Sequence, residues 1–197
     1  MQAMLADSVQ WYTASKVSPQ EPVCPTRDIF QARLDSLYRS LLAAGQAEHA
    51  TALLIAVVGE IGNNCFDHNL GTWNDVPGCR FTSCLEQDTH WIIIADRGQG
   101  ILASLRRVAP QLASHQEALE TAFQKQLSGR APEQRGNGLK FVRQVINGHA
   151  GCGVCCVSGD GIFSFGELAD QLTADVADHH RNAPAPGTLT LIGWRMA

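Results

Sequence analysis

The sequence is poor in charge, in aromatic residues and in long apolar runs. Charged side chains make up 17% of its 197 residues and aromatic ones 7%, and the formal net charge is −4. It has no basic run and no acidic tail, so we expect no nucleic-acid surface. The longest unbroken apolar stretch, Ala52 to Val58, has seven residues, whereas a helix needs about 20 to span a bilayer. The N-terminus also lacks the basic and apolar regions of a signal peptide. Together these features predict a cytoplasmic protein that does not contact membranes.

Cysteine occurs seven times, an odd number at uneven spacing, and without an export signal we expect reduced thiols. Cys152 and Cys155 form a Cys-x-x-Cys that would suit zinc if both thiols lay on one side. On the strand predicted here, Cys152 and Cys156 lie on one face and Cys155 on the other. Buried free thiols are therefore the expected state, because free cysteine behaves as a small apolar residue.

Hydrophobic spacing predicts one α+β domain over residues 26–197, preceded by an N-terminal arm at residues 1–25 that contains three prolines. Helices are expected at about 26–45, 47–68, 114–128 and 137–147, and strands at 80–85, 91–95, 153–157, 162–165 and 188–194. The strand at 91–95 is apolar on both faces and is expected to be central. Residues 168–186 form an excursion of undefined structure. The order of elements predicts a layer of helices on one face of a mostly antiparallel sheet.

A polar stripe is predicted near the end of the second helix. Glu60, Asn64, Asp67 and His68 follow one another at steps of four, three and one, so on a helix they share one side. Glu60 could act as a general base, and the amide oxygen of Asn64 suits Mg²⁺. A solvated helix end, with these side chains serving as caps, is the alternative interpretation.

Two glycine-containing segments complete the candidate site. Asp96-Arg97-Gly98-Gln99-Gly100-Ile101 follows the central strand, and Asp96 could accept a hydrogen bond from an exocyclic amine such as that of adenine. Arg135-Gly136-Asn137-Gly138-Leu139 opens a predicted helix whose free N–H groups and dipole favour an anion, with Lys140 in the first turn. Taken singly, each segment also fits an ordinary loop or helix start.

The order of these segments resembles that of the ATP-binding domain shared by DNA gyrase, heat-shock chaperones, histidine kinases and mismatch-repair ATPases, the GHKL superfamily. The resemblance covers residues 26–195 and includes Gly187-Thr188 before the last strand. It implies a Bergerat-type two-layer α/β sandwich that binds ATP and Mg²⁺, with Glu60 as general base. A lid at residues 102–135 would close over the nucleotide. The residues assigned to the cofactor are Asn64 (also the Mg²⁺ ligand), His68, Asp96, Gly98, Gly100, Ile101, Arg135, Gly136, Asn137, Gly138, Leu139, Lys140 and Thr188.

The chain differs from most classes of that superfamily. Only ten residues follow Gly187, so we expect no transducer domain after the last strand, and no histidine precedes His49 as a phospho-acceptor on an upstream helix. The nearest analogy is a stand-alone histidine-kinase-like ATPase or anti-sigma-type serine kinase that acts on a separate protein partner, and the resemblance leaves room for a homodimer. A module that binds ATP as a switch, without catalysis, is the alternative.

Overall fold

The computed structural model describes residues 1–15, 23–69, 72–73, 75–124, 138–180 and 185–196. Its helices are α1 (Gln2–Thr13), α2 (Arg27–Ala43), α3 (Glu48–Asp67), α4 (Gly100–Arg106), α5 (His115–Gln124), α6 (Gly138–Asn147) and α7 (Ala169–His180). Its strands are β1 (Val23–Cys24), β2 (Cys79–Glu86), β3 (Thr89–Asp96), β4 (Cys152–Ser158), β5 (Gly161–Gly166) and β6 (Thr188–Arg195). None of the described helices has the length and apolar character needed to cross a bilayer.

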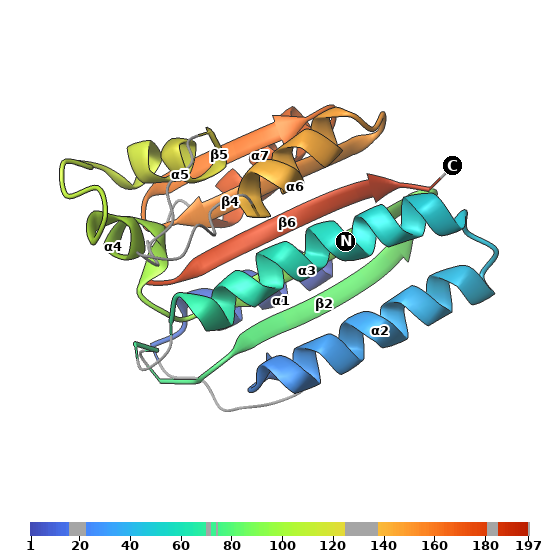
Figure 1. The fold of residues 1–197 in the computed structure, drawn as a ribbon, viewed down its shortest axis with the longest axis horizontal. Coiled ribbons are helices and arrows are strands. Elements are labelled where there is room, and N and C mark those ends of the chain that lie inside the picture. The colour runs from blue at the N-terminus through green and yellow to red at the C-terminus, as the bar shows by residue number, and fades with distance from the viewer. Residues whose placement is uncertain (16–22, 70–71, 74, 125–137, 181–184, 197) are drawn as a thin grey trace.

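The strands form one open sheet in the order β1-β2-β3-β6-β4-β5, and every described pairing is antiparallel (Figure 1). The last strand, β6, lies between the two hairpins β2–β3 and β4–β5. All eight residues of β3 are buried, which confirms the prediction of a central strand. The α+β class predicted from the sequence is confirmed as well.

Helices α2, α3, α5 and α6 cover one face of this sheet, and their apolar side chains join those of the strands in the main core. Helix α2 begins where the sequence predicts, because the Thr26 hydroxyl accepts a hydrogen bond from the Ile29 amide at 3.4 Å. Its Phe30 ring packs on α3 at Gly62, where a Cβ atom would lie 2.0 Å from the ring. Close packing of this kind fixes α3 over the sheet, and α3 carries the polar stripe.

The opposite face is covered by α1 and α7, which lie behind the sheet in Figure 1. Sheet residues on this side, including Ile93, Cys155 and Leu191, are fully buried against the two helices. The structure thus adds a second helical layer to the single one that the sequence predicts. The added helices come from the arm at residues 1–25 and from the excursion at 168–186. The strands explain the addition, because β3, β4 and β6 are apolar on both faces and both faces must be shielded from water.

The stretch expected as a lid contains two helices that belong to the main core. Leu102 and Leu105 of α4 and Leu119 and Phe123 of α5 are buried there. Helices α4 and α5 are therefore packed into the main core, which argues against free movement of these two helices as a lid. The rest of the predicted lid, residues 125–135, lies outside the described residues.

Candidate functional site

Asp96 ends the central strand β3 and is almost completely buried, with 3% of its surface exposed. Its Oδ1 atom accepts hydrogen bonds from the Asn69 side-chain amide and from the Gly98 backbone N–H, both at 2.9 Å. Burial raises the pKa of Asp96 to about 6, although hydrogen bonds from Gly98, Asn69, Cys65 and Thr188 oppose the rise. A buried carboxyl group in this setting is suited to bind a polar group of a ligand.

Asn69 holds the loop after Asp96 in place, and the sequence analysis did not identify it. Its amide nitrogen also donates to the Cys65 carbonyl at 2.9 Å, and its Oδ1 accepts from the Gln99 amide at 3.1 Å. Gly98 lies directly against this side chain, since a Cβ atom there would be 2.0 Å from the Asn69 amide carbon. The glycine at position 98 is therefore explained by close packing. In the sequence, the one feature that could have identified Asn69 as a site residue is its position directly after His68, the last residue of the predicted stripe.

The pairing of β3 with β6 places Thr188 directly opposite Asp96, so the second and fourth sequence segments meet. Gly187, at a φ of +101°, brings its Cα so close that a Cβ atom would lie 2.2 Å from the Asp96 carbonyl oxygen. Ser158 joins these loops, donating to the Gly187 carbonyl at 3.0 Å and accepting from the Ile101 amide at 3.0 Å. Gly100 lies beside it at a φ of +76°. Ser158 is a second site residue that the sequence analysis missed.

The polar stripe on α3 meets the helix that starts at the third segment. The Glu60 carboxylate lies against Gly138, the first residue of α6, where a Cβ atom would be 2.2 Å from Glu60 Oε2. Glu60 is exposed, and among the described residues it has no hydrogen-bond or ion-pair partner. Leu139 and Lys140, in the first turn of α6, are half-buried. Arg135, Gly136 and Asn137 lie outside the described residues, so the structure places only the second half of this segment.

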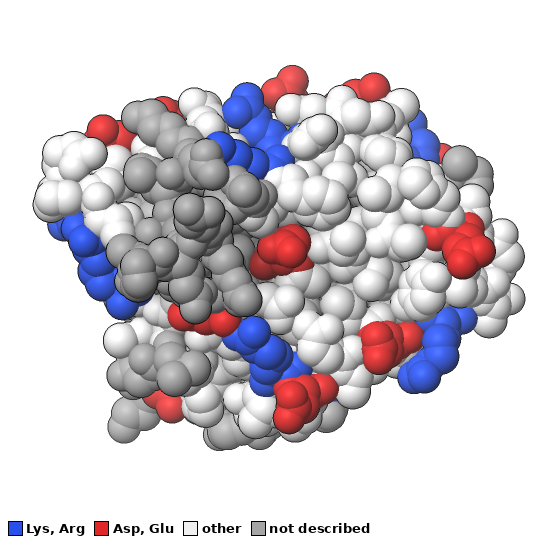
Figure 2. All heavy atoms as spheres, viewed as in Figure 1, with Lys and Arg blue, Asp and Glu red and all other residues white. Residues whose placement is uncertain are grey.

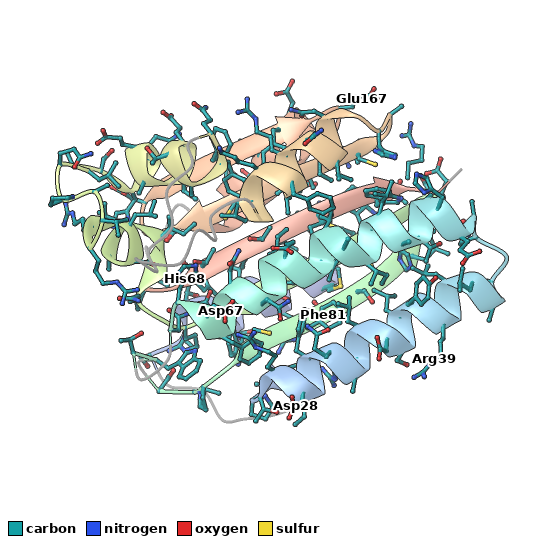
Figure 3. The ribbon with its side chains drawn as sticks, viewed as in Figure 1. Asp28, Arg39, Asp67, His68, Phe81 and Glu167 are labelled. Carbon is teal, nitrogen blue, oxygen red and sulfur yellow. The ribbon has the colours of Figure 1, made fainter. Side chains whose placement is uncertain are left out.

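Asp67 and His68 lie at the C-terminal end of α3 (Figure 3). The His68 ring faces α4, where its Nδ1 is 3.1 Å from the Ser104 hydroxyl, and the His68 carbonyl accepts a hydrogen bond from the Gln99 side chain. Burial, and to a smaller extent the charge of Arg107, lowers the pKa of His68. The imidazole is thus neutral at pH 7 and positions α4. Asp67 instead pairs with Arg27 of α2.

Among the described residues of this region, α3 offers two neighbouring oxygen-bearing side chains to a metal ion, those of Glu60 and Asn64. Asn64 is half-buried, one turn from Glu60, and its side chain makes no hydrogen bond with the described part of the chain. No group of three His, Cys, Asp or Glu residues within the described ranges is placed to hold a metal ion. These residues fit Mg²⁺, which takes one or two protein oxygen ligands and keeps water or phosphate oxygens in its other positions.

All seven cysteines are free thiols, and only Cys84 is partly exposed. Cys152 and Cys156 lie in the main core, whereas Cys155 lies in the core of the opposite face, so the predicted alternation is confirmed. Burial raises the pKa of Cys155 to about 11 and that of Cys156 to about 12. These thiols remain protonated at neutral pH and serve as apolar core residues.

Acidic and basic groups are interspersed over the face shown in Figure 2. A groove of about 410 Å³ between α2 and β2 shares no residue with the candidate site and is lined by Arg33, Ser36, Leu37, Ser40, Phe81, Thr82 and Ser83.

The structure thus joins Asp96, Gly98, Gly100, Ile101 and Thr188 in one cluster, and Glu60 with Gly138 in a second. The second half of α3 connects the two clusters, because Asn69, just beyond the end of this helix, donates a hydrogen bond to Asp96.

The chain was compared with known protein families and with curated proteins, and neither comparison identified a family. No protein-family model matches the chain, and no curated protein matches its sequence.

Proposed function

We propose that this protein binds ATP with Mg²⁺, in the manner of the GHKL domains that its sequence segments resemble, and acts on a separate protein partner as a kinase or ATPase. The observation that supports the proposal is that the described parts of the four segments lie in two clusters connected by the second half of α3. Glu60 and Asp67, the last residue of α3, are seven positions apart, which is about 10 Å of helix, and Asn69 follows two residues later. An elongated ligand with an amine-bearing base at one end and phosphates at the other suits that separation.

The division of roles follows from the chemistry at each end. Asp96, supported by Asn69 and Thr188, is assigned to the exocyclic amine of adenine. The start of α6 at Gly138 supplies N–H groups and a positive dipole end for phosphates. Asn64 would hold Mg²⁺, which neutralises phosphate charge. Glu60 would then orient the attacking hydroxyl or water and accept its proton, since phosphoryl transfer depends mainly on positioning and charge neutralisation.

The second candidate is a nucleotide-dependent switch that binds or releases its partner without transfer. The exposure of Glu60, which has no partner among the described residues, favours catalysis, because a carboxylate beside the phosphate site would only repel the ligand in a pure binding module.

Thermal unfolding with nucleotides tests the proposal. At 100 times its dissociation constant, Mg²⁺–ATP should stabilise the fold by about 2.7 kcal/mol, or roughly 5–10 °C in melting temperature for a chain of this size. Mg²⁺–GTP serves as the matched control and should do much less, because guanine carries a carbonyl where adenine carries the amine. Equal shifts with both nucleotides would refute the role of Asp96, and no shift with either would refute the nucleotide site.

A further inference from the structure

Helix α1, which lies outside the four sequence segments, is fastened to the loop that follows Asp96 and to the loop that leads to Thr188. We propose that Arg97 and Tyr12 are positioning residues that couple the docking of α1 to nucleotide binding. The inference rests on the proposed function, because the loops concerned are those assigned to the adenine end of ATP.

The first attachment is made by Arg97, the residue between Asp96 and Gly98. Its side chain is 8% exposed, and its guanidinium donates to the carbonyls of Trp11, Tyr12 and Ala14 at 2.7–2.8 Å. These carbonyls belong to the C-terminal end of α1, where backbone acceptors lack partners within the helix and a cation is favoured.

The same guanidinium forms a two-pronged ion pair with the Asp75 carboxylate at 2.8 and 2.9 Å. It also lies 5.8 Å from the centre of the Trp11 ring. A planar fork with five donors matches this set of acceptors, which an ammonium group could not satisfy. Displacement of α1 from the sheet would therefore break or strain the hydrogen bonds of Arg97, the residue next to Asp96.

The second attachment is made by Tyr12. Its buried hydroxyl donates to the Ala185 carbonyl at 3.0 Å and to the Gly187 carbonyl at 3.4 Å. Burial raises the pKa of Tyr12 well above its usual range, so the hydroxyl stays protonated and remains a donor. Gly187 touches the backbone of Asp96 and precedes Thr188. One helix thus holds the loop that follows Asp96 and also the loop that leads to Thr188.

Two sites that share such an element influence each other reciprocally. If ATP requires both loops in their docked positions, ATP binding must oppose the undocking of α1. At 100 times the dissociation constant, the ligand then suppresses opening of α1 by about 100-fold. A helix that served only to cover the sheet would gain no such local protection.

Amide hydrogen exchange on the full chain, with and without a non-hydrolysable ATP analogue and Mg²⁺, tests the coupling. Amides of α1 that exchange through local opening should slow by up to about 100-fold. Helix α7 is the internal control, since it packs on the same face, while its Asp175 and Thr173 side chains bond to Gln2 and Ser164, which belong to neither loop. Its locally exchanging amides should change little. Equal effects on the two helices, or none on α1, would overturn the proposal.

A conservative variant distinguishes a role of α1 in positioning the two loops for ATP from a role in stabilising the fold alone. Tyr12→Phe keeps the ring and removes the donor, so the dissociation constant for Mg²⁺–ATP should rise by up to about fivefold, the equivalent of one net hydrogen bond. Gln2→Ala is the matched control: it removes the bond from the other end of α1 to Asp175 and should leave that constant unchanged. A Tyr12→Phe protein that melts earlier yet binds ATP as the parent does would mean that α1 is only structural. If the parent chain itself binds no ATP, the proposed function fails and the coupling fails with it.

Discussion

Replacing Asp96 by asparagine should stabilise the protein at neutral pH while removing its preference for adenine. The substitution keeps the shape of the side chain and an oxygen that accepts from Asn69 and Gly98, but it removes a buried charge. The pKa of Asp96 rises from its usual 3.8 to about 6 in the folded protein. At about 1.4 kcal/mol per pKa unit, the ionised carboxylate costs the folded state about 3 kcal/mol above pH 6.

The direction of the pH dependence follows from proton binding. Between pH 4 and 6 the folded protein holds a proton on Asp96 that the unfolded chain has lost, so stability falls as pH rises through this window and levels off above it. The Asp96→Asn variant lacks this dependence. Its advantage in free energy of unfolding over the parent should therefore grow by about 2 kcal/mol between pH 4.5 and 7.5.

Urea unfolding of both proteins at several pH values, without nucleotide, measures this difference. Taking the difference between parent and variant cancels the titration of all other groups. The same variant should lose the extra stabilisation that ATP gives over GTP. A difference between the two proteins that stays constant from pH 4.5 to 7.5 would refute the reasoning, because the Asp96 carboxyl would then titrate alike in the folded and unfolded states.

Three further outcomes are expected. Glu60→Ala should retain ATP binding but lose about 10²–10⁴-fold in hydrolysis or transfer, whereas turnover at the parent rate would favour the switch. Gly98→Ala should destabilise the fold by about 1–3 kcal/mol in urea unfolding, because its Cβ would overlap the Asn69 amide. Gly59→Ala in α3 is its control, since that Cβ would meet Leu34 at an ordinary 3.4 Å, and a similar loss in both would contradict the explanation. Amides of α4 and α5 should be protected from hydrogen exchange without nucleotide, because both helices contribute to the main core; rapid exchange there would restore the idea of a lid.

The sequence determined the elements whose patterns are local and strong. Helix α2 has a threonine cap and a regular apolar face, and α3 has an apolar side and a polar stripe. The spacing of apolar residues within each segment is therefore enough to predict the helix. Strand β3 shows its central place by being apolar on both faces. The opposite orientations of Cys152 and Cys155 also follow from the period of a strand alone.

The second helical layer, formed by α1 and α7, could not be predicted from local sequence patterns. Helix α1 buries Leu5, Val9 and Tyr12, but whether those side chains cover a sheet is settled by β3, β4 and β6, which lie far along the chain. The two helices in the expected lid were misjudged for a related reason. Position between two glycine-containing segments says nothing about the depth at which Leu119 and Phe123 are packed.

The tertiary structure alone decided how the candidate site is assembled. Sequence order could nominate Asp96 and Thr188, but only the β3–β6 register makes them neighbours across the sheet. Asn69 and Ser158 gave no periodic signal, because their importance lies in hydrogen bonds to residues 27–57 positions away. Likewise, Arg97 is an unremarked loop residue in the sequence, and it becomes the anchor of α1 because folding brings three carbonyls and one carboxylate within reach of its guanidinium.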